Sequence, residues 1–152
     1  MFSFIGQVLL NNEFAMTNES YIQKEIPLCG LNDLEDRCAM ELIIEERQLF
    51  AIRQDNSIFA YWNLCPHRNS PLNWVPNKFL DIENQLIQCA LHGALFEIDS
   101  GLCIAGPCTG ESLQPVELRC ENQFYYVAAD QKMPPAPVNL RAQALADLED
   151  RE

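Results

Sequence analysis

Histidine and the basic residues are the scarce side chains of this sequence. The chain of 152 residues contains two histidines, and ten Lys and Arg face twenty-two Asp and Glu, which gives a net charge of −12. A site that needs three histidines is therefore excluded. A chain this acidic is also poorly suited to hold a nucleic-acid backbone or an anionic membrane surface, so we expect neither as a partner.

The sequence also shows no targeting or membrane-spanning signal. The apolar run within residues 1–10 is too short to cross a bilayer, and no Lys or Arg precedes it. Asn11, Asn12 and Glu13 follow where a signal peptide would have small residues. Seven cysteines are an odd number and too few for a disulfide-stapled secreted domain. We therefore expect a cytoplasmic protein whose cysteines are metal ligands or small buried side chains.

The spacing of apolar residues indicates one all-β domain. A length of 152 residues fits a single domain, and no long segment between residues 21 and 127 has a 3.6-residue apolar period. Short apolar runs separated by turn residues predict strands instead. The expected strands are residues 21–26, 38–44, 48–53, 57–62, 86–89, 94–98, 114–119 and 124–128.

Turn residues suggest how some of these strands pair. Asp55 and Asn56 predict a hairpin between residues 48–53 and 57–62. Residues 121–123 similarly predict a pair between the last two strands. Pro27 is expected to end the first strand.

The composition changes after Asp130. The proline-rich residues 133–137 are expected to be extended. Asn139 can cap a short helix that runs to about Asp150. Its apolar stripe is too short to be stable alone, so the helix either docks on the domain or frays. We therefore divide the chain into an N-terminal extension (residues 1–20), a main domain (21–130), and a linker with a short C-terminal helix or tail (131–152).

Both histidines lie two or three residues after a cysteine, at the end of a predicted strand. The first pair is Cys65 and His67, and the second is Cys89 and His92. Two such loops can present two thiolates and two imidazoles to one point. This combination selects zinc, iron or an iron–sulfur cluster over calcium or magnesium.

The other cysteines carry no such pattern. Cys29, Cys38 and Cys120 are interpreted as structural. Cys103 and Cys108 can approach each other across a Gly-Pro turn, and we expect them to be small buried thiols rather than a disulfide. Among metals, structural zinc sites commonly use like pairs, Cys-x-x-Cys and His-x-His. A Cys/His pair on each loop favours a two-iron centre, in which thiolates hold one iron and imidazoles the other.

These residues resemble the Rieske [2Fe-2S] family. The matching segments are Cys65-Pro-His-Arg-Asn-Ser-Pro-Leu72, Cys89-Ala-Leu-His-Gly-Ala-Leu-Phe96, Gly101-Leu-Cys and Gly106-Pro107. The resemblance implies stacked antiparallel sheets, an incomplete barrel or sandwich, with a small cluster-binding subdomain. It implies one cluster per chain, with Cys65 and Cys89 on the buried iron and His67 and His92 on the exposed one. Residues 106–110 resemble the proline loop that covers the cluster in this family.

Three departures from the family pattern are visible. Twenty-one residues separate His67 from Cys89, more than is usual, so residues 74–85 are expected to form an enlarged excursion beside the cluster. The two extra cysteines of high-potential members are replaced by Ser70 and Leu91. High-potential members also carry two hydroxyl donors to the cluster, and Ala94 and Phe96 stand at those places here. This difference predicts a reduction potential toward the lower part of the Rieske range.

The function implied by this resemblance is electron transfer. We expect a soluble Rieske-type ferredoxin that passes single electrons between a reductase and an oxygenase or other redox enzyme, without independent catalysis. Both histidines are used by one cluster, so the mononuclear iron site of a full oxygenase subunit is excluded. Two alternatives stay open: a Rieske-like small subunit of a larger reductase, of the nitrite reductase type, and a zinc-binding structural module.

Overall fold

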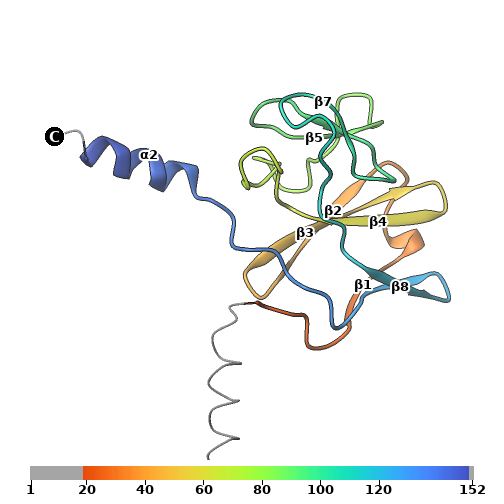
Figure 1. The fold of residues 1–152 in the computed structure, drawn as a ribbon. Coiled ribbons are helices and arrows are strands. Elements are labelled where there is room, and N and C mark those ends of the chain that lie inside the picture. Colours follow the sequence, from red (N-terminus) through yellow and green to blue (C-terminus); the bar gives the residue numbers. More distant parts are fainter. Residues whose placement is uncertain (1–18, 151–152) are drawn as a thin grey trace, which may run out of the picture.

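Three small antiparallel sheets lie in layers, and none of them closes into a barrel (Figure 1). The structure is a computed structural model that describes residues 19–150, so nearly all of the expected N-terminal extension lies outside the described residues. The sheets are β1-β9-β8, β2-β3-β4 and β5-β6-β7. The strand bounds are β1 Ile26–Gly30, β2 Ala39–Ile44, β3 Arg47–Gln54, β4 Ser57–Trp62, β5 Ile87–Gln88, β6 Leu95–Phe96, β7 Cys103–Ala105, β8 Leu118–Glu121 and β9 Phe124–Val127. The expectation of an all-β core of stacked sheets is confirmed.

The middle sheet separates two hydrophobic cores. Along β3, Phe50 and Ile52 pack into the core on the side of β5 to β7, while Leu49 and Ala51 pack into the core on the other side. All four side chains are fully buried. Because successive side chains of a strand point to opposite faces, a strand between two layers becomes a continuous apolar run. The predicted hairpin is also confirmed, with Gln54 paired to Ser57.

The first predicted strand was placed wrongly. Pro27 was expected to end it, but β1 begins at Ile26 and runs through Pro27, which pairs with Tyr126. The reason is that β1 lies at the edge of its sheet, where the missing N–H of proline removes no ladder bond. The ladder is irregular just after Pro27. Residues 20–22 instead bond to the C-terminal segment, with Ile22 N–H donating to the Gln131 carbonyl at 3.0 Å.

Two further strand predictions differ from the structure. β7 was not predicted, and its three residues are too few for an alternating pattern to show. The strand expected at residues 114–119 begins only at Leu118. Residues before it make single contacts to the neighbouring sheet, such as the bridge between Pro115 and Tyr61. β5 and β6 are shorter than expected, at two residues each.

The C-terminal segment crosses the domain before it forms a helix. The Arg47 Nε donates to the Pro134 carbonyl at 3.0 Å, and the Val138 N–H donates to the Asn69 carbonyl at 2.9 Å. Asn139 caps α2, Leu140–Glu149, as predicted, because its side chain accepts the Ala142 N–H. The helix points away from the sheets (Figure 1). Within the described residues, no helix is long and apolar enough to cross a membrane.

Candidate metal centre

Two loops with the same backbone hydrogen-bond pattern contain the four predicted ligands. In the first loop the Cys65 N–H donates to the Ser70 carbonyl at 2.8 Å, and in the second the Cys89 N–H donates to the Ala94 carbonyl at 2.9 Å. Each cysteine is thus held at the base of a tight loop that closes five residues later. The Ala90 N–H donates to the Leu72 carbonyl at 2.7 Å and ties the two loops together.

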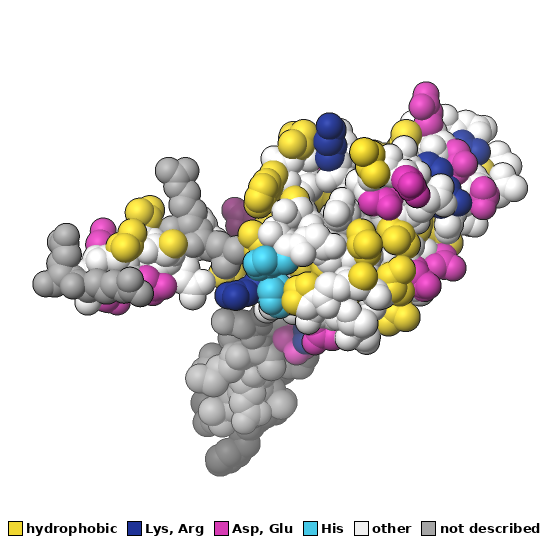
Figure 2. All heavy atoms as spheres, turned by 90° about the horizontal axis from the view of Figure 1, so that it is seen from above, with side chains coloured by type: hydrophobic (Ala, Val, Ile, Leu, Met, Phe, Trp, Pro, Cys, Tyr) yellow, Lys and Arg dark blue, Asp and Glu magenta, His cyan; other side chains and the backbone are white. Residues whose placement is uncertain are grey.

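The four side chains separate into an inner and an outer pair. Cys65 and Cys89 are 2% and 1% exposed, whereas His67 is half-buried and His92 is exposed. The imidazole rings lie edge to face with their centroids 4.8 Å apart. Figure 2 shows the two histidines side by side on the surface, with hydrophobic side chains on one side of them and a Lys or Arg side chain directly beside them on the other. The structure therefore brings together all four residues that the sequence singled out.

The interaction between the two inner thiols shifts their pKa values in opposite directions. A hydrogen bond from Cys65 lowers the pKa of Cys89 to about 6, and the backbone N–H groups of Leu91 and His92 add to this effect. The same contact, together with burial, raises the pKa of Cys65. One of the two inner thiols therefore becomes a thiolate, the form that binds metals, more readily than an ordinary cysteine does.

A buried asparagine positions the first loop. Asn63, 2% exposed, donates to the side-chain oxygens of Gln48 (2.9 Å) and Asn73 (2.8 Å). Its own oxygen accepts the Leu72 N–H at 2.8 Å. These bonds fix both ends of the segment that contains Cys65. Asn63 could not be singled out from the sequence, since one polar residue after an apolar strand gives no distinctive signal.

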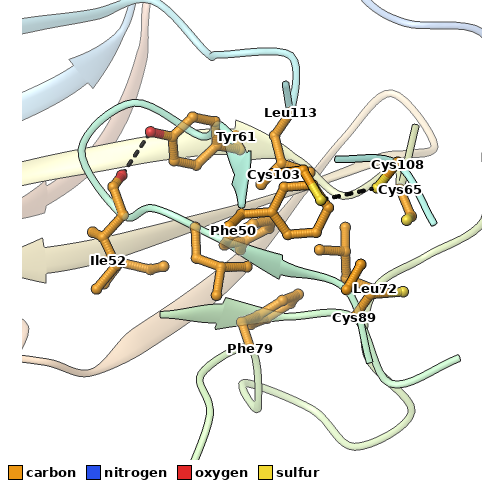
Figure 3. Packing of buried hydrophobic residues seen from close by; sticks show 14 residues of the cluster. Phe50, Ile52, Tyr61, Cys65, Leu72, Phe79, Cys89, Cys103, Cys108 and Leu113 are labelled. Atoms are coloured by element: carbon orange, nitrogen blue, oxygen red, sulfur yellow. Dashed lines mark hydrogen bonds between the residues drawn. The ribbon is translucent and has the colours of Figure 1, made fainter. Parts of the chain in front are cut away.

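A third loop covers the inner side of the centre, as the resemblance implies for residues 106–110. Gly106 has a φ of +110°, and a Cβ on it would lie 2.8 Å from the Ala94 Cα. The third loop therefore sits directly on the end of the second ligand loop. It places Cys108 beside Cys65, with the Cys108 Sγ also 3.3 Å from the Cys103 Sγ (Figure 3). Desolvation raises the pKa of Cys108 to about 11.

The enlarged excursion at residues 74–85 is anchored on the middle sheet by Phe79, and most of its other residues are exposed. Phe79 is 1% exposed and stacks on Phe50 with ring centroids 4.2 Å apart. Its carbonyl accepts the Gln88 N–H at 2.8 Å, which holds the excursion against β5. Trp74, by contrast, is 74% exposed near the first loop. Packing is therefore the role of Phe79, and Trp74 is left on the surface beside the centre.

The other five cysteines are not among the four predicted ligands. All seven are free thiols. Cys29 is buried in the other core, Cys38 is half-buried and Cys120 is exposed. Cys103 and Cys108 are buried thiols, as expected.

The donor set fits a two-iron cluster. Within residues 19–150, no three His, Cys, Asp or Glu side chains are arranged as one metal ion would require. A Rieske centre needs only two protein ligands per iron, with thiolates on one and imidazoles on the other, and the inner and outer pairs supply these. The buried Ser70 hydroxyl has no hydrogen-bond partner within the part of the chain that the structure describes. A cluster beside Cys65 would offer this donor sulfur acceptors.

Comparisons with known proteins agree with this geometry. The family model described as the Rieske [2Fe-2S] domain matches residues 24–133. No curated protein sequence matches the chain.

Solved structures share the fold at low sequence identity. One is the ferredoxin of carbazole 1,9a-dioxygenase from Nocardioides aromaticivorans IC177, which is 20% identical, with a TM-score of 0.56 over 71% of this chain and 100% of that one. Another is the terminal oxygenase of carbazole 1,9a-dioxygenase from Novosphingobium sp. KA1, 17% identical, with a TM-score of 0.58 over 76% of this chain and 32% of that one. A complex of reduced oxygenase and oxidized ferredoxin in carbazole 1,9a-dioxygenase matches at 21% identity, with a TM-score of 0.57 over 74% of this chain and 99% of the matched chain.

Proposed function

The chain belongs to the Rieske [2Fe-2S] domain family, and from this we propose that it is a ferredoxin-like carrier of single electrons between a reductase and an oxygenase or other redox enzyme. The observation that carries the proposal is the division of the four side chains, with two thiols buried and two imidazoles 4.8 Å apart at the surface. The family's cofactor is a Rieske-type [2Fe-2S] cluster, which supplies one-electron chemistry when bound.

We assign the ligands by their burial. Cys65 and Cys89 would hold the inner iron, and His67 and His92 the outer one. The protein's part is to fix these positions, to exclude water from the sulfurs and to leave one edge accessible to a partner. The backbone N–H groups of His67, Leu91 and His92 point at the two cysteine sulfurs and stabilise their thiolate forms.

The surroundings of the centre favour a low reduction potential. Ala94 and Phe96 are buried and carry no hydroxyl at the two places where high-potential members carry donors. Fewer donors leave the added electron less stabilised. We expect a midpoint in the lower part of the Rieske range of about −150 to +300 mV, and protein-film voltammetry would measure it.

Two observations support a protein partner. The fold is shared with a chain named as the ferredoxin of a dioxygenase and with a complex of oxygenase and ferredoxin. The net charge of −12 also suits long-range attraction to a basic surface. Hydrophobic side chains and a Lys or Arg side chain border the histidines (Figure 2). Charge would therefore steer the approach, and apolar contact would hold the complex.

The cytoplasmic location and the division of the chain at residues 20 and 130 stay predictions.

One observation favours the second candidate, a small subunit of a larger reductase. Helix α2 points away from the sheets, and its Leu145 and Leu148 are 54% and 59% exposed. A helix with exposed leucines is suited to bind permanently to another subunit. Stable co-purification with a reductase subunit would support this candidate, whereas a free carrier would purify alone.

The proposal is tested by spectroscopy on anaerobically purified protein. We expect two irons and two sulfides per chain, a red-brown colour and a rhombic EPR signal in the reduced state, with an average g value below about 2. His92→Ala should abolish this spectrum while the β-sheet circular dichroism is retained. Arg68→Ala is the matched control, because Arg68 is exposed on the first loop, and it should keep the spectrum.

Two results would contradict the proposal. A colourless protein that holds stoichiometric zinc would make the chain a structural zinc module. A His92→Ala variant with an unchanged Rieske spectrum would show that the ligand assignment is wrong.

A further inference from the structure

Ser70, on the first ligand loop, has a buried hydroxyl group without a partner. The residue is 4% exposed, and its hydroxyl oxygen is shut off from solvent and makes no hydrogen bond to any atom of residues 19–150. Ser70 also lines the pocket beside Trp74 and Leu91. Because the oxygen itself is covered, water in that pocket does not satisfy it. An unpaired buried hydroxyl destabilises a fold, and nearly all such groups in native proteins have a partner.

The backbone directs this hydroxyl to the same side as the Cys65 thiol. Cys65 and Ser70 face each other across an antiparallel bridge, in which the Cys65 N–H donates to the Ser70 carbonyl at 2.8 Å. Residues that face each other in antiparallel pairing project their side chains to the same side, with Cβ atoms about 4.5–5.5 Å apart. The Ser70 hydroxyl therefore lies on the face of the first loop that carries one of the inner ligands.

The backbone around Ser70 is held without help from the hydroxyl. The Asn69 carbonyl accepts the Val138 N–H at 2.9 Å, and the Leu72 carbonyl accepts the Ala90 N–H at 2.7 Å. Closure of the first loop therefore gives the hydroxyl no role. A bound cluster adds sulfur atoms beside the inner ligands, and these sulfurs carry negative charge. A charged acceptor forms a stronger hydrogen bond than a neutral one.

We propose that Ser70 donates its hydroxyl proton in a hydrogen bond to a sulfur of the bound cluster and so raises the reduction potential. The proposal rests on the proposed function and on the ligand role of Cys65 given above. Reduction adds negative charge to the cluster and its sulfur ligands, and a donor to one of these sulfurs stabilises the reduced form more than the oxidised form. One hydroxyl at Ser70 compensates in part for the two that are missing at Ala94 and Phe96.

The test compares single variants of the cluster-loaded protein by protein-film voltammetry. Ser70→Ala removes one oxygen atom and should lower the equilibrium constant for reduction at least threefold, which is about 28 mV at 59 mV per tenfold change. Ser70→Thr keeps the hydroxyl and should recover at least half of this shift. In electron–nuclear double resonance of the reduced protein, one coupling from an exchangeable proton should disappear in Ser70→Ala and persist in Ser70→Thr.

A matched control separates donation to the cluster from loss of a buried hydroxyl as such. Tyr61 belongs to the same core as the inner ligands, and its hydroxyl donates to the Ile98 carbonyl at 2.6 Å. Tyr61→Phe should leave the potential within 5 mV, about a 1.2-fold change, of the unmodified protein. The proposal is overturned if Ser70→Ala leaves the potential unchanged, if Ser70→Thr is shifted as far as Ser70→Ala, or if Tyr61→Phe lowers the potential equally.

The remaining outcomes are also decisive. If Ser70→Ala does not retain its cluster, Ser70→Cys takes its place, because an S–H is a weaker donor than a hydroxyl. Ser70→Cys should lower the equilibrium constant at least twofold, about 18 mV, and an unchanged potential would contradict the proposal. An unmodified protein without a Rieske spectrum would overturn the proposed function, and with it the premise of this inference. A Rieske spectrum in all variants with identical potentials would reject only the role of Ser70.

Discussion

The close approach of the third loop to the second ligand loop can be tested with one pair of glycines. Gly106 and Gly110 both have positive φ angles, +110° and +92°. A Cβ at Gly106 would lie 2.8 Å from the Ala94 Cα and 3.1 Å from its Cβ, whereas a Cβ at Gly110 would meet no atom of the described residues within 4 Å. Alanine at either position strains the backbone, but only alanine at Gly106 also forces the two loops apart.

The expected free energies follow from these contacts. The strained φ costs about 1–3 kcal/mol at either position, and the stiffer unfolded chain returns about 0.4–1 kcal/mol. Gly110→Ala should therefore lower the free energy of unfolding by about 1–2 kcal/mol. The clash adds a further cost of about 1–3 kcal/mol in Gly106→Ala, because the atoms it meets are backbone or directly attached to backbone. The total for Gly106→Ala is about 2–5 kcal/mol.

Two assays distinguish the variants. Urea unfolding of the cluster-free protein gives the free energies without the complication of a bound cofactor. Loss of visible absorbance under a chelator gives the rate of cluster release, which should rise more in Gly106→Ala than in Gly110→Ala because only the former moves Ala94. Equal destabilisation and equal release rates in both variants would refute the direct contact between the loops.

Three further predictions concern groups that hold the domain together. Tyr61→Phe should lower the free energy of unfolding by about 1–3 kcal/mol in urea titrations, because the buried Tyr61 hydroxyl donates to the Ile98 carbonyl at 2.6 Å; an unchanged midpoint would contradict this. Asn63→Ala should cost about 2–4 kcal/mol and speed the release of the cluster, since the Leu72 N–H loses its acceptor; normal release would show that Asn63 does not hold the first loop. Arg119 lowers the pKa of Glu25, so the pair stabilises the fold above the ordinary Glu pKa of about 4.3 and loses this effect as the pH falls through the lowered value. Glu25→Gln should therefore be slightly destabilising at pH 7 and neutral in strong acid, and the same small difference at both pH values would exclude the ion pair as its cause.

The four candidate ligands could be recognised from the sequence because their signal is local. Each Cys/His pair lies within four residues, and a strand end followed by a tight loop is enough to place it. The hairpin of β3 and β4 was predictable for the same reason, since Asp55 and Asn56 lie between two clear apolar runs. Short-range patterns of this kind do not depend on the rest of the chain.

The parts that could not be predicted depend on contacts between distant segments. Whether a strand can pass through Pro27 depends on that strand lying at a sheet edge, which only the pairing with β9 decides. The surroundings of Cys108 likewise depend on contacts between distant segments. A cysteine five residues from Cys103 suggests contact between these two, but its contact with Cys65, forty-three positions away, appears only when the third loop folds over the first.

The two outer histidines are not equivalent, because His67 is half-buried and His92 is exposed. Asn69, two residues after His67, accepts the Val138 N–H, so the segment that leads to α2 lies along the first loop. Val138 and Ser70 line a pocket with Leu91 and Trp74, on the flank of both loops. The second loop places His92 further into solvent than His67. If the chain is the proposed electron carrier, a partner that approaches this face would meet His92 first, with Trp74 and Val138 nearby as exposed apolar side chains.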